Sequence, residues 1–322
     1  MLLSQFSAIL LRRRISLISA LAPLLAAPVS AQDLELMPVH YHTPYAHYAN
    51  NLQPVHLAPA PAAPSSLLNG LPAQLRSEIA YVQDLASSTT LYQKNSTVVR
   101  PIASITKLMT ALIVLEAAQD MDEILEVSSA DVDRVKNTTS RLSVGSRLSR
   151  ADMLHLALMS SENRAANALG RYYPGGLSAF VRAMNDKARA LGMRQTRFVE
   201  PTGLSSENVS SPRDLVALMQ ATAKQPLIHQ YTTSEQHIVE PRPGRQLIYN
   251  NTNRLVQNDK WDIKVSKTGF INEAGQCLVL LTKFEGRDIA IVLLNAQGRY
   301  SRIGDAIRLR NLVEGSNKLA ML

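Results

Sequence analysis

The sequence contains little cysteine and no extended run of basic residues. Cys277 is the only cysteine among 322 residues, so no intrachain disulfide can form. Because Cys277 stands in the apolar stretch 277–281, we expect a buried core thiol rather than a reactive one. The absence of a basic run argues against a nucleic-acid partner. The formal net charge is +8, or 8 − 3 = +5 without the three arginines at 12–14, and this modest positive charge suits association with an anionic polymer or a membrane surface.

An apolar stretch long enough to span a membrane is also missing. Three arginines at 12–14 precede the apolar stretch 15–27, and the small residues Val29, Ser30 and Ala31 follow it. This order is typical of a cleaved secretory signal, so we predict that residues 1–31 are a signal peptide removed on export. A retained anchor is the alternative, but the stretch is shorter than the roughly 20 residues that a spanning helix needs.

Residues 32–75 have many prolines and no sustained apolar period, which indicates a flexible tether. A metal-scavenging tract is the alternative, because this segment also contains His40, His42, His47 and His56. No cysteine or carboxylate accompanies these histidines at a fixed spacing, so we predict a solvated linker, no metal site and no cofactor.

Folded structure is predicted over residues 76–316, with a short tail at 317–322. Ser149 is expected to cap a helix by accepting hydrogen bonds from the free amides of its first turn. Strands at both ends with helices between them imply a sheet built from distant segments, and so an α/β layered domain with a helical lobe. The strand-like patterns cover 78–84, 90–93, 262–267, 276–284 and 288–295. The helical ones cover 102–118, 151–158, a stretch that starts at Arg164, 177–191, 211–224 and 303–313.

Three short patterns carry the chemistry: Ser104-Ile105-Thr106-Lys107, Ser161-Glu162-Asn163 and Lys267-Thr268-Gly269. Each one alone is common by chance in a chain of this size. Together they are more specific, because they stand at a buried helix start, in a loop between helices and at a strand end.

The first pattern can form an activated nucleophile. Ser104 and Lys107, three residues apart, face the same side of a helix, so the amine can reach the hydroxyl. A desolvated lysine near a helix N-terminus and another cation is favoured in its neutral form and can act as a base. Ser104 then becomes an acylating nucleophile, and its backbone amide suits one half of an oxyanion hole.

With these motifs the chain resembles the low-molecular-mass penicillin-binding proteins, which are serine D,D-peptidases. It is most similar to their D-alanyl-D-alanine endopeptidase branch, sometimes called penicillin-binding protein 7. The similarity covers roughly residues 78–314. The segments that carry it are 100–104, 158–164, 198–204, 251–256 and 267–270.

The resemblance implies four catalytic residues. Ser104 would attack the substrate carbonyl, with Lys107 as the general base. Ser161 would relay the proton to the leaving amine. Asn163 would hold both Lys107 and the substrate carbonyl.

The resemblance also implies how substrate binds. Lys267 would supply positive potential, and Thr268 would hydrogen-bond the substrate carboxylate or backbone. Gly269 would leave room for substrate along the strand, and the Phe270 amide would be the second oxyanion donor. The expected fold has an antiparallel sheet from N- and C-terminal strands with helices on both faces. The expected partners are peptidoglycan in the periplasm and β-lactam antibiotics as covalent inhibitors, with no stable transmembrane anchor.

Three other features have less specific interpretations. The triplet Ser206-Glu207-Asn208 repeats the second motif, but we prefer Ser161 because it lies between two apolar helices in family-like surroundings. Arg302 stands where some relatives place a carboxylate-binding arginine, but the local match is poor and we interpret it as a surface residue. His155 stands among apolar residues, so we expect a packed structural histidine.

Three alternatives compete with the endopeptidase prediction. A D,D-carboxypeptidase commonly carries a second C-terminal domain and an amphipathic anchor, whereas only 53 residues follow Gly269 in this chain. A class A β-lactamase would need a water-activating glutamate in a Glu-x-x-Leu-Asn loop, and the closest segment, 200–204, has the wrong spacing and no asparagine. A catalytically idle scaffold would not need the reacting side chains.

Overall fold

A computed structural model describes residues 74–320, with the side chains of residues 74–315. These residues lie in the compact unit Pro59–Leu322. The predicted signal peptide at 1–31 and nearly all of the predicted tether at 32–75, with its four histidines, lie outside the described residues. Within residues 74–320 no helix is both long and apolar enough to cross a membrane.

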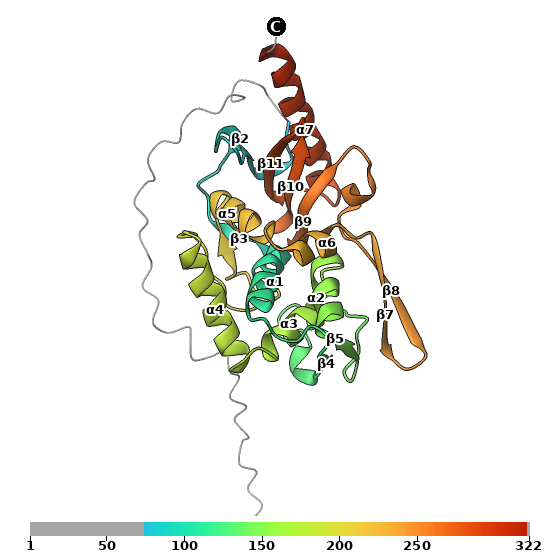
Figure 1. The fold of residues 1–322 in the computed structure, drawn as a ribbon. Helices are drawn as coiled ribbons and strands as arrows, with labels where there is room; N and C mark the ends of the chain where they lie inside the picture. Colours follow the sequence, from blue (N-terminus) through green and yellow to red (C-terminus); the bar gives the residue numbers. More distant parts are fainter. Residues whose placement is uncertain (1–73, 321–322) are drawn as a thin grey trace, which may run out of the picture. The chain divides into compact units, whose positions relative to one another are not determined.

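The domain is built on one antiparallel sheet whose strands come from both ends of the chain (Figure 1). Tyr81 near the start of the domain pairs with Val292 near its end, which confirms the prediction of a sheet from distant segments. The third motif lies on an edge strand of this sheet. The strand order is β2 (Thr90–Lys94), β1 (Ser77–Asp84), β11 (Arg287–Ala296), β10 (Gly275–Phe284) and β9 (Asp262–Ile271).

The helices α1 to α6 lie between β2 and β9 in the chain, as expected, and form the lobe below the sheet in Figure 1, while α7 follows β11. Ser149 caps the second of them by accepting from the Asp152 amide at 3.0 Å, as predicted. The helices are α1 (Thr106–Glu116), α2 (Arg150–Met159), α3 (Asn163–Arg171), α4 (Gly176–Ala190), α5 (Pro212–Thr222), α6 (Pro226–Thr233) and α7 (Ser301–Ala320).

Short elements connect these helices to the sheet. One of them, the hairpin β7–β8, extends away from the helical lobe and was not expected from the sequence (Figure 1). The paired strands are β3 (Arg100–Pro101) with β6 (Val209–Ser210), β4 (Ile124–Glu126) with β5 (Arg147–Ser149), and β7 (Gln236–Arg242) with β8 (Arg245–Asn250), and the 3-10 turns are η1 (Ala103–Ile105), η2 (Ser129–Asp131) and η3 (Arg254–Gln257).

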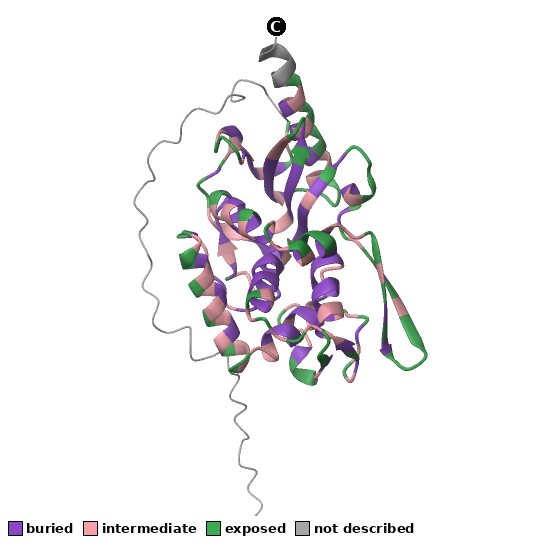
Figure 2. Ribbon diagram, viewed as in Figure 1, coloured by how far each residue is buried: buried purple, intermediate pink, exposed green. Residues whose placement is uncertain are grey.

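The sheet separates two hydrophobic cores, which appear as buried segments on both of its sides (Figure 2). Successive side chains of a strand point to opposite faces. Ile79 and Tyr81 accordingly pack with the helical lobe, while Ala80 and Val82 pack on the opposite side with Leu309 of α7. Helices therefore cover both faces of the sheet, as the family resemblance implied.

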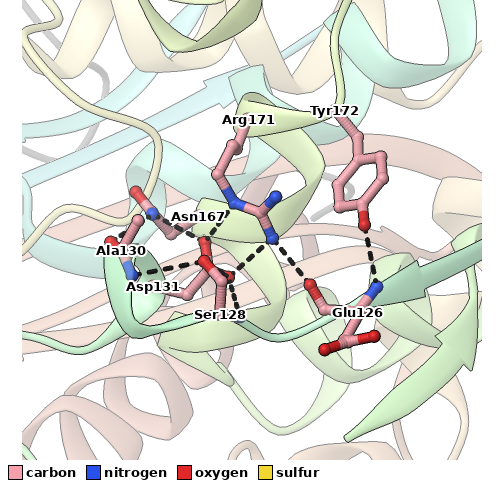
Figure 3. Close-up of polar contacts among 7 residues, drawn as sticks. All are labelled: Glu126, Ser128, Ala130, Asp131, Asn167, Arg171 and Tyr172. Atoms are coloured by element: carbon pink, nitrogen blue, oxygen red, sulfur yellow. Dashed lines mark hydrogen bonds and ion pairs between the residues drawn. The ribbon is translucent and has the colours of Figure 1, made fainter. Parts of the chain in front are cut away.

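A buried carboxylate fixes the loop that leads to the site. The Asp131 side chain is fully buried, and its Oδ2 accepts a hydrogen bond from Arg171 Nη2 at 2.8 Å (Figure 3). Asp131 Oδ1 also accepts from Asn167 Nδ2 at 3.0 Å. Because both partners lie on α3, the ion pair and the hydrogen bond hold the start of the loop 132–146 against this helix.

Candidate active site

The three motifs converge where the helical lobe meets the edge strand β9. Ser104 lies in η1 and Lys107 in the first turn of α1, while Ser161 and Asn163 lie where α2 passes into α3. The expected single helix over 102–118 is wrong at its start, since α1 begins only at Thr106. Ala103 has a φ of +48°, a conformation that breaks the helix and is uncommon for a residue with a side chain.

Lys107 is the centre of the site. Its side chain is buried, and Nζ lies 3.0 Å from Ser104 Oγ, 2.7 Å from Asn163 Oδ1 and 2.6 Å from the Thr202 carbonyl oxygen. The sequence motifs brought Lys107, Ser104 and Asn163 together. Thr202 was missed because it contributes its backbone carbonyl, which any residue type could supply.

Burial lowers the pKa of Lys107 to about 8, against the opposing attraction of Glu200 and Glu162. A neutral amine has two N–H groups and one lone pair. If the N–H groups donate to Asn163 and to the Thr202 carbonyl, the lone pair is left to accept the hydroxyl proton of Ser104. The arrangement can therefore activate Ser104 as a nucleophile.

The backbone around Ser104 is closely packed from two sides. A Cβ added at Gly269 would lie 3.1 Å from the Ser104 amide nitrogen, and one at Gly203 would lie 1.9 Å from the Ala103 carbonyl oxygen. Gly203 also has a φ of +82°, which favours glycine. Both glycines thus let neighbouring backbone approach the turn that presents the half-buried Ser104.

Ser161 and Lys267 lie in the site without a hydrogen bond to its central lysine. Ser161 has a φ of +63°, a strained conformation of the kind that is common in active sites. Among the described residues no hydrogen bond joins its hydroxyl to Lys107 or Lys267. Lys267 is buried and donates to the Thr268 carbonyl at 3.0 Å. Burial, and then the charges of Lys107 and Arg302, hold the pKa of Lys267 well below its usual value.

The residues near the end of β9 differ in their exposure and in their contacts. Phe270 is 55% exposed beside the site. Thr268 Oγ1 donates to Thr252 Oγ1 at 2.7 Å, so Thr252 is a further member that sequence analysis did not single out. Arg302, expected at the surface, is only partly exposed. Its Nη1 donates to the Gly269 carbonyl at 2.8 Å, because α7 packs against the sheet and brings this arginine to the third motif.

One loop of the helical lobe reaches both the site and the sheet. Asn163 Nδ2 donates to Thr138 Oγ1 at 3.2 Å, which orients the amide so that Oδ1 faces Lys107. Lys136 of the same loop forms an ion pair with Glu273, in the turn after β9. The loop 132–146 therefore connects the two sides of the candidate site.

The two remaining polar residues of the sequence analysis are packed as expected. Cys277 is buried, and burial raises the pKa of its thiol to about 11. His155 is 8% exposed and stacks on Tyr231 with ring centres 4.3 Å apart. Within residues 74–320 no group of three or more histidine, cysteine or acidic residues could hold a metal ion.

The two Ser-Glu-Asn triplets have different surroundings. Asn163 contacts Lys107, whereas Asn208 is fully buried and donates to Glu200 Oε1 at 2.9 Å. We expect Ser161→Ala to slow acylation by a penicillin about 100-fold or more, because it removes the hydroxyl that the family resemblance implies as the proton relay. The matched variant Ser206→Ala should acylate at the wild-type rate. A slow Ser206→Ala beside a fast Ser161→Ala, measured by stopped-flow labelling, would contradict the choice of triplet.

Comparisons with known proteins identify the family of the chain. A family model described as D-alanyl-D-alanine carboxypeptidase matches residues 67–298. The chain is 49% identical over 248 residues to a Pseudomonas aeruginosa protein named D-alanyl-D-alanine endopeptidase, which covers 76% of this chain and 80% of that protein. It is 47% identical over 242 residues to an Escherichia coli protein of the same name, which covers 75% of this chain and 78% of that protein.

Solved structures show the same fold. A Streptomyces DD-transpeptidase superposes with a TM-score of 0.69 at 26% identity, over 74% of this chain and 97% of that chain. A penicillin-binding protein from Listeria monocytogenes, solved in an ampicillin-bound form, superposes with a TM-score of 0.64 at 29% identity, over 75% of this chain and 98% of that chain. The chain therefore belongs to the D-alanyl-D-alanine carboxypeptidase family of serine peptidases.

Proposed function

We propose that Ser104 is the acylating nucleophile of this enzyme and Lys107 its general base. The observation that carries this proposal is the position of Lys107 Nζ, which lies 3.0 Å from Ser104 Oγ and has two further acceptors within 2.7 Å. Ser104 Oγ attacks the substrate carbonyl while its proton passes to Lys107. The amine of the leaving group then takes a proton and departs, and water hydrolyses the ester on Ser104.

The other motif residues support this reaction. Ser161 relays the proton to the leaving amine, and Asn163 holds Lys107 and the substrate carbonyl. Lys267 supplies positive potential, and Thr268 hydrogen-bonds the substrate carboxylate or backbone. The amides of Ser104 and Phe270 stabilise the oxyanion of the tetrahedral intermediate. The proximity of Gly269 to the Ser104 amide supports this position of the oxyanion, because a side chain at 269 would crowd it.

We propose that the bond cut is the D-Ala to diaminopimelate cross-link of peptidoglycan. The support is the 49% and 47% identity to proteins named D-alanyl-D-alanine endopeptidase. β-Lactams would acylate Ser104, a proposal supported by the similarity to an ampicillin-bound structure. Peptidoglycan as the substrate implies a periplasmic enzyme exported by the signal peptide at 1–31. The tether at 32–75 would join it to the catalytic domain at 76–316, with a tail at 317–322.

A D,D-carboxypeptidase is the second candidate, because the matching family model carries that description.

A β-lactamase is disfavoured by Glu200, whose carboxylate accepts hydrogen bonds from the amides of Thr202 and Gly203 and so is occupied within its own loop. Slow turnover of nitrocefin, with a long-lived acyl-enzyme, separates the peptidase from a β-lactamase. Covalent labelling by a fluorescent penicillin separates it from an idle scaffold.

Incubation of the purified enzyme with cross-linked dimeric muropeptides and with monomeric pentapeptides tests the proposed bond. We expect dimers to be converted to monomers, because the branch that the chain most resembles acts on cross-links. Chromatographic separation of the products gives the ratio of the two reactions. Release of free D-Ala with the dimers left intact would replace the endopeptidase with a carboxypeptidase.

A further inference from the structure

The carboxylate of Glu200 is linked to Lys107 through Thr202 and has no part in the reaction proposed above. Glu200 is 9% exposed, in the loop between α4 and β6. Its Oε2 accepts from the Thr202 amide at 2.6 Å and also from the Thr202 hydroxyl. Its Oε1 accepts from the Gly203 amide at 2.6 Å, the Ser205 amide at 3.3 Å and Asn208 Nδ2 at 2.9 Å.

This environment requires a group that only accepts hydrogen bonds. The backbone amides and the Asn208 side-chain nitrogen can only donate to the group at position 200. An ionised carboxylate can accept hydrogen bonds from all of these donors. A neutral glutamine amide would instead place its own N–H groups against some of them. The Asn208 amide is itself fixed, because its Oδ1 accepts from the Val199 amide at 2.7 Å and its Nδ2 donates to the Glu200 carbonyl at 2.8 Å.

The loop that Glu200 organises is hydrogen-bonded to Lys107 and to the segment that precedes Ser104. The Thr202 carbonyl accepts from Lys107 Nζ at 2.6 Å. The Pro201 carbonyl accepts from Thr110 Oγ1 at 2.7 Å, one turn further along α1. At the other end, the Asn208 carbonyl accepts from the Ile102 amide at 3.0 Å, two residues before Ser104. A shift of this loop would therefore move the carbonyl that orients the lysine.

The charge of Glu200 also acts on the lysine. The charges of Glu200 and Glu162 favour the ammonium form of Lys107. Lys267 is the neighbouring cation, and the charge of Lys107 lowers the pKa of Lys267. Glu162 caps α3 and accepts from Ser140 Oγ at 2.7 Å, so it belongs to the opposite wall of the site. Of the two carboxylates, only Glu200 is connected to Lys107 through an intervening hydrogen-bonded residue.

We propose that Glu200 is a positioning residue that acts through the Thr202 carbonyl and, by its charge, sets the pH range in which Lys107 accepts the Ser104 proton. This inference rests on the proposed function, because it assigns Glu200 a role in the same acylation step. It differs from the role of a water-activating glutamate, since the Glu200 carboxylate accepts from Thr202, Gly203 and Asn208 and makes no hydrogen bond to Ser104 among the described residues. Its task is to hold one acceptor in place and to oppose the loss of the lysine proton.

The test compares wild-type protein with Glu200→Gln, Glu200→Asp and the matched control Glu207→Gln. Glu207 lies in the same loop, but it is exposed and pairs with Arg197 instead of the site. The acylation rate by a fluorescent penicillin is measured from about pH 6 to pH 10, and melting temperatures report on folding.

In Glu200→Gln we expect the midpoint of the pH profile to fall by about one unit, since the lost negative charge no longer favours the ammonium. We also expect the rate at high pH to fall about 10-fold, because the Thr202 carbonyl is less firmly held. Glu200→Asp keeps the charge but shortens the side chain, so its midpoint should stay while its rate falls. Glu207→Gln should match the wild type in both.

Each alternative outcome has a definite meaning. A Glu200→Gln variant with a lower melting temperature and rate but the wild-type midpoint would overturn the inference and leave a purely structural role. If Glu200→Gln does not fold, a Glu200→Asp variant with the full wild-type rate would overturn it as well. Wild-type protein that the penicillin labels at no pH would overturn the proposed function itself, and the inference with it.

Discussion

Ser104→Ala is expected to slow the hydrolysis of cross-linked muropeptides by about four orders of magnitude or more, the loss that removal of a covalent nucleophile causes in serine peptidases. The variant keeps Lys107, Asn163 and the Thr202 carbonyl, but it has no atom that can form the ester. Ser104 is half-buried in a turn, and the change removes only one hydroxyl group, so the fold should be retained. Product formation by chromatography gives the rate, and the melting temperature is the control. Residual hydrolysis above about one hundredth of the wild-type rate would contradict the assignment.

Lys107→Ala is expected to slow acylation about 10²–10⁴-fold, the usual contribution of a general base. The lysine is fully buried, so the substitution also leaves space and two acceptors, Asn163 Oδ1 and the Thr202 carbonyl, without their donor. Lys107→Met fills this space without a base and is the matched control for the loss of volume. Both variants should be slow, as measured by labelling with a fluorescent penicillin.

The pH dependence separates the base from a packing effect. Only the neutral amine can accept a proton, and the pKa of Lys107 is about 8. In the wild type the rate should therefore fall about tenfold per pH unit below this value and level off above it. The profile of Lys107→Met should lack this step, since no lysine titrates. A step that persists near pH 8 in the variant would show that another group is the base.

The sequence was sufficient for most of the sheet and for two of the three residues that contact Lys107, Ser104 and Asn163. The strands β1, β10 and β11 have long apolar runs, and the motif spacing placed Ser104, Asn163 and Gly269 at the ends of elements. The hairpin β7–β8 was missed because its strands are largely exposed and contain Pro241, which weakens the strand pattern. The break before α1 was missed because it depends on the backbone conformation of Ala103, in a sequence that otherwise suits a helix.

The network behind the site shows a different limit of sequence reasoning. Asn208 belongs to the triplet that repeats the second motif and that was not assigned to the site. It is nevertheless a buried residue that donates a hydrogen bond to Glu200. Thr202 contributes through its carbonyl, so its side chain gives no indication of the contact with Lys107. The similarity of segment 198–204 to the family was a usable signal, but only the fold shows which atoms of this segment face the lysine. Arg302 likewise acquires its place from the packing of α7 on the sheet.

The central claim is that the enzyme works through an ester on Ser104, and mapping a β-lactam adduct tests it most directly. The wild-type protein is treated with penicillin, its intact mass is measured, and a proteolytic digest is sequenced by tandem mass spectrometry. The account predicts one penicilloyl group per chain, on Ser104, which persists long enough to be isolated. An adduct on Ser161, Ser206 or any other residue, or a protein whose mass does not change, would contradict it.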